Sequence, residues 1–135
     1  MIGNGNLAIM IQEIFKSAET ADQQIITSLK GICNFKYKMQ DGNCTEISFY
    51  DDESILGGTL RRHPLKKEIV QKIANFKNLK HLDLRKCKVS FLPNFVSRSL
   101  EFLDLSCNDI DVFPKWITKQ PLLKHLNLGA NKLKE

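Results

Sequence analysis

The chain has 135 residues, 42% of them hydrophobic, and a net charge of +5, so it can bury one core and a single domain is expected. Its four cysteines have no regular spacing and no Cys-x-x-Cys pair, which favours reduced thiols in a cytoplasmic protein over a disulfide framework. No apolar run approaches the length of a membrane span, and the start lacks the pattern of a signal peptide.

Residues 1–43 are expected to form an N-terminal helical cap followed by the first strand of a hairpin. Apolar side chains recur there at three- and four-residue spacing, which predicts one long helix or two helices broken near Thr20. Asn6 is the expected N-cap. A cap over one end of the core is favoured over a helix for a partner or a membrane. The apolar stripe consists of Leu7, Ile11, Ile14, Ala18, Ala21, Ile25 and Leu29.

Residues 35–50 predict a β-hairpin. Phe35, Tyr37 and Met39 alternate with lysines, and Asp41-Gly42-Asn43 is a turn signal. The second strand has an apolar spacing that we interpret as a degenerate first copy of a repeat that becomes clear downstream. Its pattern is Cys44-x-x-Ile47-x-Phe49-x-x-Asp52.

Positive charge is concentrated in residues 61–88, which carry ten Lys or Arg against two Asp or Glu, whereas residues 1–60 carry four against eight. Pro64 is expected to open a helix there, with its lysines on the solvated side. A basic surface for nucleic acid or an anionic membrane is an alternative function, but no aromatic interleaving typical of base stacking accompanies the lysines, so nucleic-acid binding is disfavoured. The apolar stripe of this helix is Leu65, Ile69, Ile73 and Phe76, and its solvated lysines are Lys66, Lys67 and Lys72.

Three copies of one eleven-residue pattern follow. In each Leu-x-Leu core the side-chain period is two, so each short strand has an apolar face that it can bury only against neighbouring strands. The asparagine position lies where the chain leaves the strand, and an amide there can satisfy backbone groups of the turn. Cys87 takes that position in the first copy and is interpreted as a small buried near-isostere. The copies are Leu79-x-x-Leu82-x-Leu84-x-x-Cys87-x-Val89, Leu100-x-x-Leu103-x-Leu105-x-x-Asn108-x-Ile110 and Leu123-x-x-Leu126-x-Leu128-x-x-Asn131-x-Leu133.

The segments between the strands repeat as well. Phe91-Leu92-Pro93-Asn94-Phe95-Val96 matches Val112-Phe113-Pro114-Lys115-Trp116-Ile117, and Val96 and Ile117 are expected to point into the core. With starts 21 and 23 residues apart, the chain resembles the leucine-rich repeat family, in particular its intracellular type with Leu-Pro-x-x-Ile/Val returns. The resemblance implies an α/β fold: a short solenoid with parallel strands on its concave face, an N-terminal helical cap and an edge hairpin. Residues 44–135 would hold one degenerate, two full and one incomplete repeat.

The outward positions of the four strands predict three rows across the concave face. Aromatic and arginine side chains are frequent at interface hot spots, so these rows are the candidate binding site, although any concave face presents a mixture of this kind. The first row is Glu46, His81, Phe102 and His125; the second is Ser48, Asp83, Asp104 and Asn127; the third is Tyr50, Arg85, Ser106 and Gly129.

Neither catalysis nor a cofactor is expected. The sequence has no Gly-rich phosphate loop, His-x-x-x-His pair or nucleophile elbow. His81 and His125 would lie two strand spacings apart, about 9–10 Å, with Phe102 between them, which is too far for one metal ion.

The resemblance implies protein–protein interaction, and an intracellular signalling or scaffolding protein is the favoured interpretation. The sequence stops two residues after Leu133 without a polar capping segment, so a fragment of a larger effector or receptor is the chief alternative. An uncapped repeat end would expose leucines and a strand edge, which predicts self-association. The identity of a protein partner does not follow from the sequence.

Overall fold

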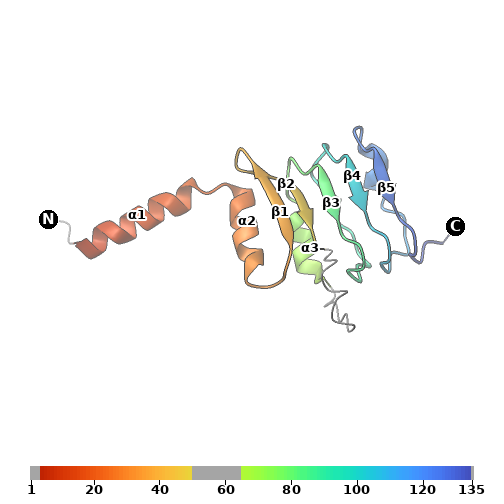
Figure 1. Ribbon diagram of the computed structural model, residues 1–135, viewed down its shortest axis with the longest axis horizontal. Helices are drawn as coiled ribbons and strands as arrows, with labels where there is room; N and C mark the ends of the chain where they lie inside the picture. Colours follow the sequence, from red (N-terminus) through yellow and green to blue (C-terminus); the bar gives the residue numbers. More distant parts are fainter. Residues whose placement is uncertain (1–3, 50–64, 135) are drawn as a thin grey trace.

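A five-stranded sheet forms the centre of the computed structural model, which describes residues 4–49 and 65–134. Its first two strands form an antiparallel hairpin, and each later strand pairs in parallel with the one before it (Figure 1). The predicted α/β class with parallel strands and an edge hairpin is therefore confirmed. The strands, in chain order and in sheet order, are β1 (Lys36–Gln40), β2 (Asn43–Ser48), β3 (His81–Asp83), β4 (Phe102–Asp104) and β5 (His125–Asn127).

The register of the parallel strands follows the sequence repeat. Glu46 of β2 pairs with His81, which pairs with Phe102, which pairs with His125. In this alignment the apolar Ile47 of β2 stands in register with Leu82 of β3 and Leu103 of β4. The assignment of a degenerate first repeat to this strand stays a prediction. Because side chains alternate between the two faces of a strand, this register determines which side chains face the core.

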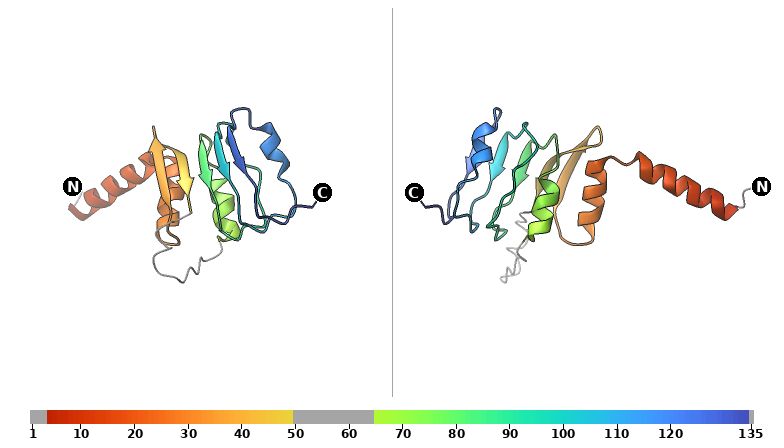
Figure 2. Two further views of the ribbon diagram at one scale, coloured as in Figure 1. Left: turned by 45° about the vertical axis from the view of Figure 1, so that its right-hand side comes forward. Right: turned by 180° about the vertical axis from the view of Figure 1, so that it is seen from behind.

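Helices cover one face of the sheet, and among the described residues the opposite face carries none (Figure 2). The covering elements are α2 (Ala21–Lys30), α3 (Lys67–Ile73) and the short 3₁₀ helix η2 (Lys115–Lys119). The core lies between these helices and the strands, and its aliphatic side chains are fully buried. Its largest members are Phe76, Ile26, Leu29, Ile47, Ile73, Leu79, Leu82, Leu84, Leu100, Leu103, Leu105 and Ile110.

The N-terminal segment forms two helices, α1 (Asn4–Ala18) and α2, with the break near Thr20 that was one of the two predictions. Thr20 caps α2, since its Oγ1 accepts a hydrogen bond from the Gln23 N–H at 3.1 Å and donates one to the Gly42 carbonyl of the hairpin turn. Asn6 lies within α1, so its assignment as N-cap is wrong. Of these two helices only α2 contacts other described elements, namely β2 and α3, so α2 alone covers this end of the core.

The helix α3 begins at Lys67, later than the start predicted at Pro64, which lies outside the described residues. Leu65 precedes the helix because its N–H donates to the Cys87 carbonyl at 2.9 Å and so joins the turn after β3. Ile69, Ile73 and Phe76 are buried as the stripe predicted.

The two return segments differ in conformation. In the second return, η2 brings Trp116 and Ile117 together into the core. The first return forms no helical turn and buries the alternate residues Phe95 and Ser97. Val96 lies between them and is 52% exposed, so the prediction that it points into the core is wrong.

No helix in the described part of the chain is long and apolar enough to cross a membrane.

Candidate functional site

The first outward position of β3, β4 and β5 carries three rings in face-to-face contact. The His81 and Phe102 rings lie 4.0 Å apart between centroids at an interplanar angle of 1°, and Phe102 and His125 lie 4.4 Å apart at 5°. Because parallel pairing repeats each position one strand spacing further on, in-register rings stack. We call His81, Phe102 and His125 the aromatic row. Glu46 extends this row onto β2 and forms an ion pair with Lys38 at 3.3 Å.

Two residues further along each strand lies a second row, Asp83, Asp104 and Asn127, which we call the Asx row. Each side chain accepts a hydrogen bond from the backbone N–H two residues later, at 3.1, 3.0 and 2.9 Å respectively. This bond turns the backbone out of the strand in all three repeats. Asp83 and Asp104 are only 4% exposed, so the prediction that both positions are exposed is wrong, and their role in binding stays a prediction.

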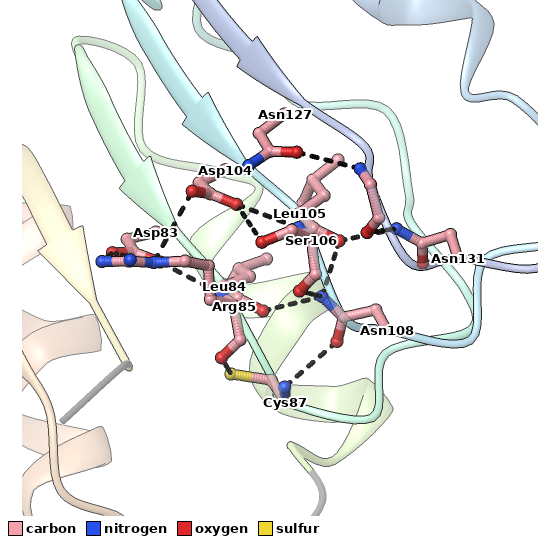
Figure 3. A network of polar contacts seen from close by, with 11 residues as sticks. Asp83, Leu84, Arg85, Cys87, Asp104, Leu105, Ser106, Asn108, Asn127 and Asn131 are labelled. Carbon is pink, nitrogen blue, oxygen red and sulfur yellow. Dashed lines mark hydrogen bonds and ion pairs between the residues drawn. The ribbon is translucent and has the colours of Figure 1, made fainter. Parts of the chain in front are cut away.

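Arg85 explains much of this burial. Its Nε and Nη2 donate to the Asp83 carboxylate at 2.7–3.1 Å, and its Nε lies 3.6 Å from Asp104 Oδ2 (Figure 3). Ser106 completes the environment of Asp104 by donating from its Oγ at 2.7 Å. A charge-assisted, bidentate contact of this kind fixes side chains strongly. Arg85 therefore has a structural role, because it stabilises the Asx row whether or not a partner is bound.

Behind the Asx row, Asn108 and Asn131 form an amide ladder between successive turns (Figure 3). The Asn108 amide donates to the carbonyls of Leu84, Leu105 and Ser106 and accepts from the N–H groups of Cys87 and Val89. Asn131 repeats the pattern one repeat later, donating to the Leu105, Leu128 and Gly129 carbonyls and accepting from the Ile110 N–H. The predicted role of the asparagine position is confirmed, and the amide also joins each repeat to the preceding one.

Cys87 occupies the ladder position of the first clear repeat. It is buried, as predicted. Its Sγ lies 3.3 Å from the carbonyl oxygen of Arg85, two residues earlier, and the Asn108 amide makes the corresponding contact with the Ser106 carbonyl. The residue before each ladder position adopts a left-handed backbone, with φ values of 55°, 58° and 54° for Lys86, Cys107 and Ala130. The turn geometry is thus the same in three repeats despite different side chains.

The Asx row could have been recognised as a structural feature from the sequence. Aspartate or asparagine stands at the same place in all three repeats, with the repeat's own spacing, and these side chains commonly bond to the backbone two residues on. The predicted third row is brought together only in part: Arg85, Ser106 and Gly129 follow the strands, and Tyr50 lies outside the described residues.

Four free thiols are distributed over the fold. Burial raises the pKa of the Cys44 thiol to about 12, and the nearby Asp22 carboxylate adds to the shift. Burial also raises the pKa of Cys33. Within residues 4–49 and 65–134, no group of three or more His, Cys, Asp or Glu side chains could hold a metal ion. The aromatic row itself places the Phe102 ring between His81 and His125.

Short parallel strands, each closed by the same turn and joined by an amide ladder, are the arrangement of leucine-rich repeats. Two family models described as leucine-rich repeats match residues 78–98 and 96–112. The chain thus contains leucine-rich repeats over residues 78–112, and repeats of this family serve as protein-interaction modules.

Two curated proteins of Arabidopsis thaliana are similar to part of the chain. Receptor-like protein 7 is 39% identical over 59 residues, and Receptor-like protein 47 is 36% identical over 56 residues. The matches cover 42% and 39% of this chain but only 6% and 7% of those proteins. No solved structure gives a significant match.

Proposed function

We propose that the chain binds a protein partner on the open face of its parallel sheet, with the aromatic row at the centre of the contact. The observation that supports this proposal most directly is the in-register stack of His81, Phe102 and His125 on the face that no described helix covers. Aromatic side chains are enriched among the residues that dominate binding energies.

The rigidity of the row supports the same proposal. Each ring of the row is fixed against its neighbour, and the strand beneath it is closed by the Asx bond and the amide ladder. Ordering a flexible side chain costs about 0.5–1.5 kcal/mol on binding, so rings that are already ordered lose less. The lysines of α3 are held by single contacts, Lys67 over the Phe91 ring at 4.4 Å and Lys72 to Ser28 Oγ at 3.4 Å, and they act mainly through screened charge.

For the wider context we favour an intracellular signalling or scaffolding role in a reducing compartment such as the cytoplasm. The four free thiols, two of them buried, support this assignment. The second candidate is a part of a larger receptor-like protein, and it is favoured by the similarity to short stretches of two much longer receptor-like proteins. Expression of the tagged chain and localisation by microscopy would separate the two.

The binding proposal is tested by isolating a partner with the immobilised chain and measuring its affinity for variants. Phe102→Ala should weaken binding by more than about 1 kcal/mol, a factor of about five. Phe113→Ala is the matched control, because Phe113 is an exposed phenylalanine on the second return and not on a strand of the sheet. Arg85→Ala is a poor probe, since it also frees two carboxylates.

The basic block supplies the competing outcome. Reversing the charge of the exposed Lys66 and Lys67 should alter mainly the salt dependence of binding. If that reversal abolishes binding while Phe102→Ala has no effect, the partner binds electrostatically on α3 and the proposal fails.

A further inference from the structure

The charged side chains around the aromatic row almost cancel at neutral pH. Glu46, which continues the row on β2, is paired with Lys38 of β1 at 3.3 Å. Glu101, which precedes Phe102, is paired with Lys124 at 3.2 Å. Among the described residues, the row, the positions just before it and the Asx row with Arg85 and its extension to β1 hold five cationic side chains against four carboxylates: Lys36, Lys38, Lys80, Arg85 and Lys124 against Glu46, Asp83, Glu101 and Asp104.

His81 and His125 determine how this balance changes with pH. Histidine is the side chain that ordinarily changes its charge between pH 5 and 8. The two imidazole groups therefore add up to two positive charges to this face as the pH falls through that range. The nearest carboxylates along the strands, Asp83 and Asp104, are 4% exposed and already in contact with Arg85, so the added charge remains available to a partner.

The stacked geometry can accommodate this charge without separating the rings. Phe102 presents one face to each imidazole, at centroid distances of 4.0 Å to His81 and 4.4 Å to His125. A cation over the face of an aromatic ring at such a distance is attracted by the ring. His81 also lies on an interior strand, with β2 on one side and β4 on the other. The row therefore stays ordered when its histidines gain protons.

We propose that the aromatic row binds an acidic segment of the protein partner, and that it binds this segment more tightly as His81 and His125 gain protons. This inference rests on the function proposed above and adds the chemistry of the partner. Carboxylates of the segment would contact the two imidazolium groups, and an apolar side chain between them would cover Phe102. Charge-assisted hydrogen bonds are stronger than neutral ones, and complementary charge around an aromatic centre favours one kind of partner over others.

Both faces of the Phe102 ring are covered by its neighbours, so this ring offers no free face on which a nucleobase could stack. The geometry therefore favours carboxylates of a protein over a nucleic acid as the source of negative charge.

The test measures binding of a rhodamine-labelled hexaaspartate peptide to the full chain by fluorescence anisotropy, at pH 7.5 and pH 5.5 and at one ionic strength. Aspartate ordinarily keeps its charge at both pH values. The parent should bind this peptide at least about tenfold more tightly at pH 5.5. A hexaasparagine peptide, which has the same length and no side-chain charge, should show no such gain.

Substitution of the two histidines locates the effect. His81→Phe/His125→Phe keeps three rings in the row but cannot gain charge, so its affinities at the two pH values should agree within about twofold. His81→Gln/His125→Gln should lose the gain as well, and it covers the case in which the first variant does not fold. His63→Phe is the matched control, because His63 is the third histidine of the chain, and it should keep the gain.

Two results would overturn the inference. One is a parent that shows no gain at pH 5.5, and the other is a gain that persists in both double histidine variants, since it would then arise outside the row. In either case the proposed function stands if Phe102→Ala still weakens binding of the isolated partner. If Phe102→Ala leaves that affinity unchanged, the proposed function fails, and the inference fails with it whatever the effect of pH.

Discussion

Replacement of Asn108 by alanine is expected to destabilise the fold more than its small change in volume would suggest. The side chain is 5% exposed, and its Oδ1 accepts the N–H groups of Cys87 at 3.1 Å and Val89 at 2.9 Å. Its Nδ2 donates to three carbonyls, at 2.8 Å to Leu84, 2.9 Å to Leu105 and 3.2 Å to Ser106. Alanine removes all five bonds, and the packed turn leaves little room for water to replace them.

The magnitude follows from the two donors. A buried backbone N–H left without an acceptor costs about 1–3 kcal/mol, so the loss of Cys87 and Val89 as partners sums to about 2–6 kcal/mol. Carbonyl oxygens have two lone pairs and lose less. We therefore expect Asn108→Ala to lower the free energy of unfolding by about 3 kcal/mol or more, a large share of the stability of a small domain.

Urea denaturation followed by circular dichroism measures this loss. Asn131→Ala should cost about half as much, because Asn131 is partly exposed and accepts a single N–H, from Ile110 at 3.0 Å. Asn94→Ala is the surface control, and it should change the free energy of unfolding by less than about 0.5 kcal/mol. If Asn108→Ala behaves like Asn94→Ala, the ladder does not carry the stability assigned to it.

Four further results are expected. Leu105→Ala should lower the free energy of unfolding by about 2–5 kcal/mol in the same assay, since Leu105 is fully buried, and a change in melting temperature within about a degree would refute the repeat register. Ala130→Gly should raise it by about 0.5–1 kcal/mol, because Ala130 adopts a φ of 54° that glycine tolerates without strain; an unchanged or lower stability would argue against that geometry. Cys107 is exposed and should react with a thiol reagent at neutral pH before the buried Cys44 does. Because the pKa of Cys44 rises from 9.0 to about 12 on folding, the unfolded chain loses this proton first, and stability should fall as the pH rises between these values; Cys44→Ala should flatten that decline.

The repeat strands could be predicted from the sequence because their signal is local and periodic. Leucines two residues apart specify the buried face, and the repetition of Leu82 at Leu103 and Leu126 specifies the register across strands. The stacking of His81, Phe102 and His125 follows from that register. Nothing further is needed to place these side chains on one line.

The features that the sequence did not predict depend on contacts that the periodic spacing of apolar residues does not specify. The burial of Asp83 and Asp104 requires Arg85 to fold back over them, and a period-two pattern cannot distinguish that arrangement from an exposed carboxylate. The apolar stripe in residues 7–29 continues through Thr20, although the chain breaks there because Thr20 bonds to the hairpin turn. Val96 was assigned by analogy with Ile117, but only the second return forms the helical turn that buries this position.

The aromatic row and the Asx row lie two residues apart on the same strands, yet they have separable roles. The Asx side chains and the amide ladder satisfy backbone groups, so a change there is felt by the whole repeat stack. The aromatic row differs from them, because Phe102 is half-buried and its ring stacks on the two neighbouring rings of the row. Phe102→Ala should therefore reduce partner affinity with little loss of stability, and Asn108→Ala should reduce stability in the absence of any partner. Measured together, the two substitutions distinguish Phe102, which is proposed to contact the partner, from Asn108, which stabilises the fold.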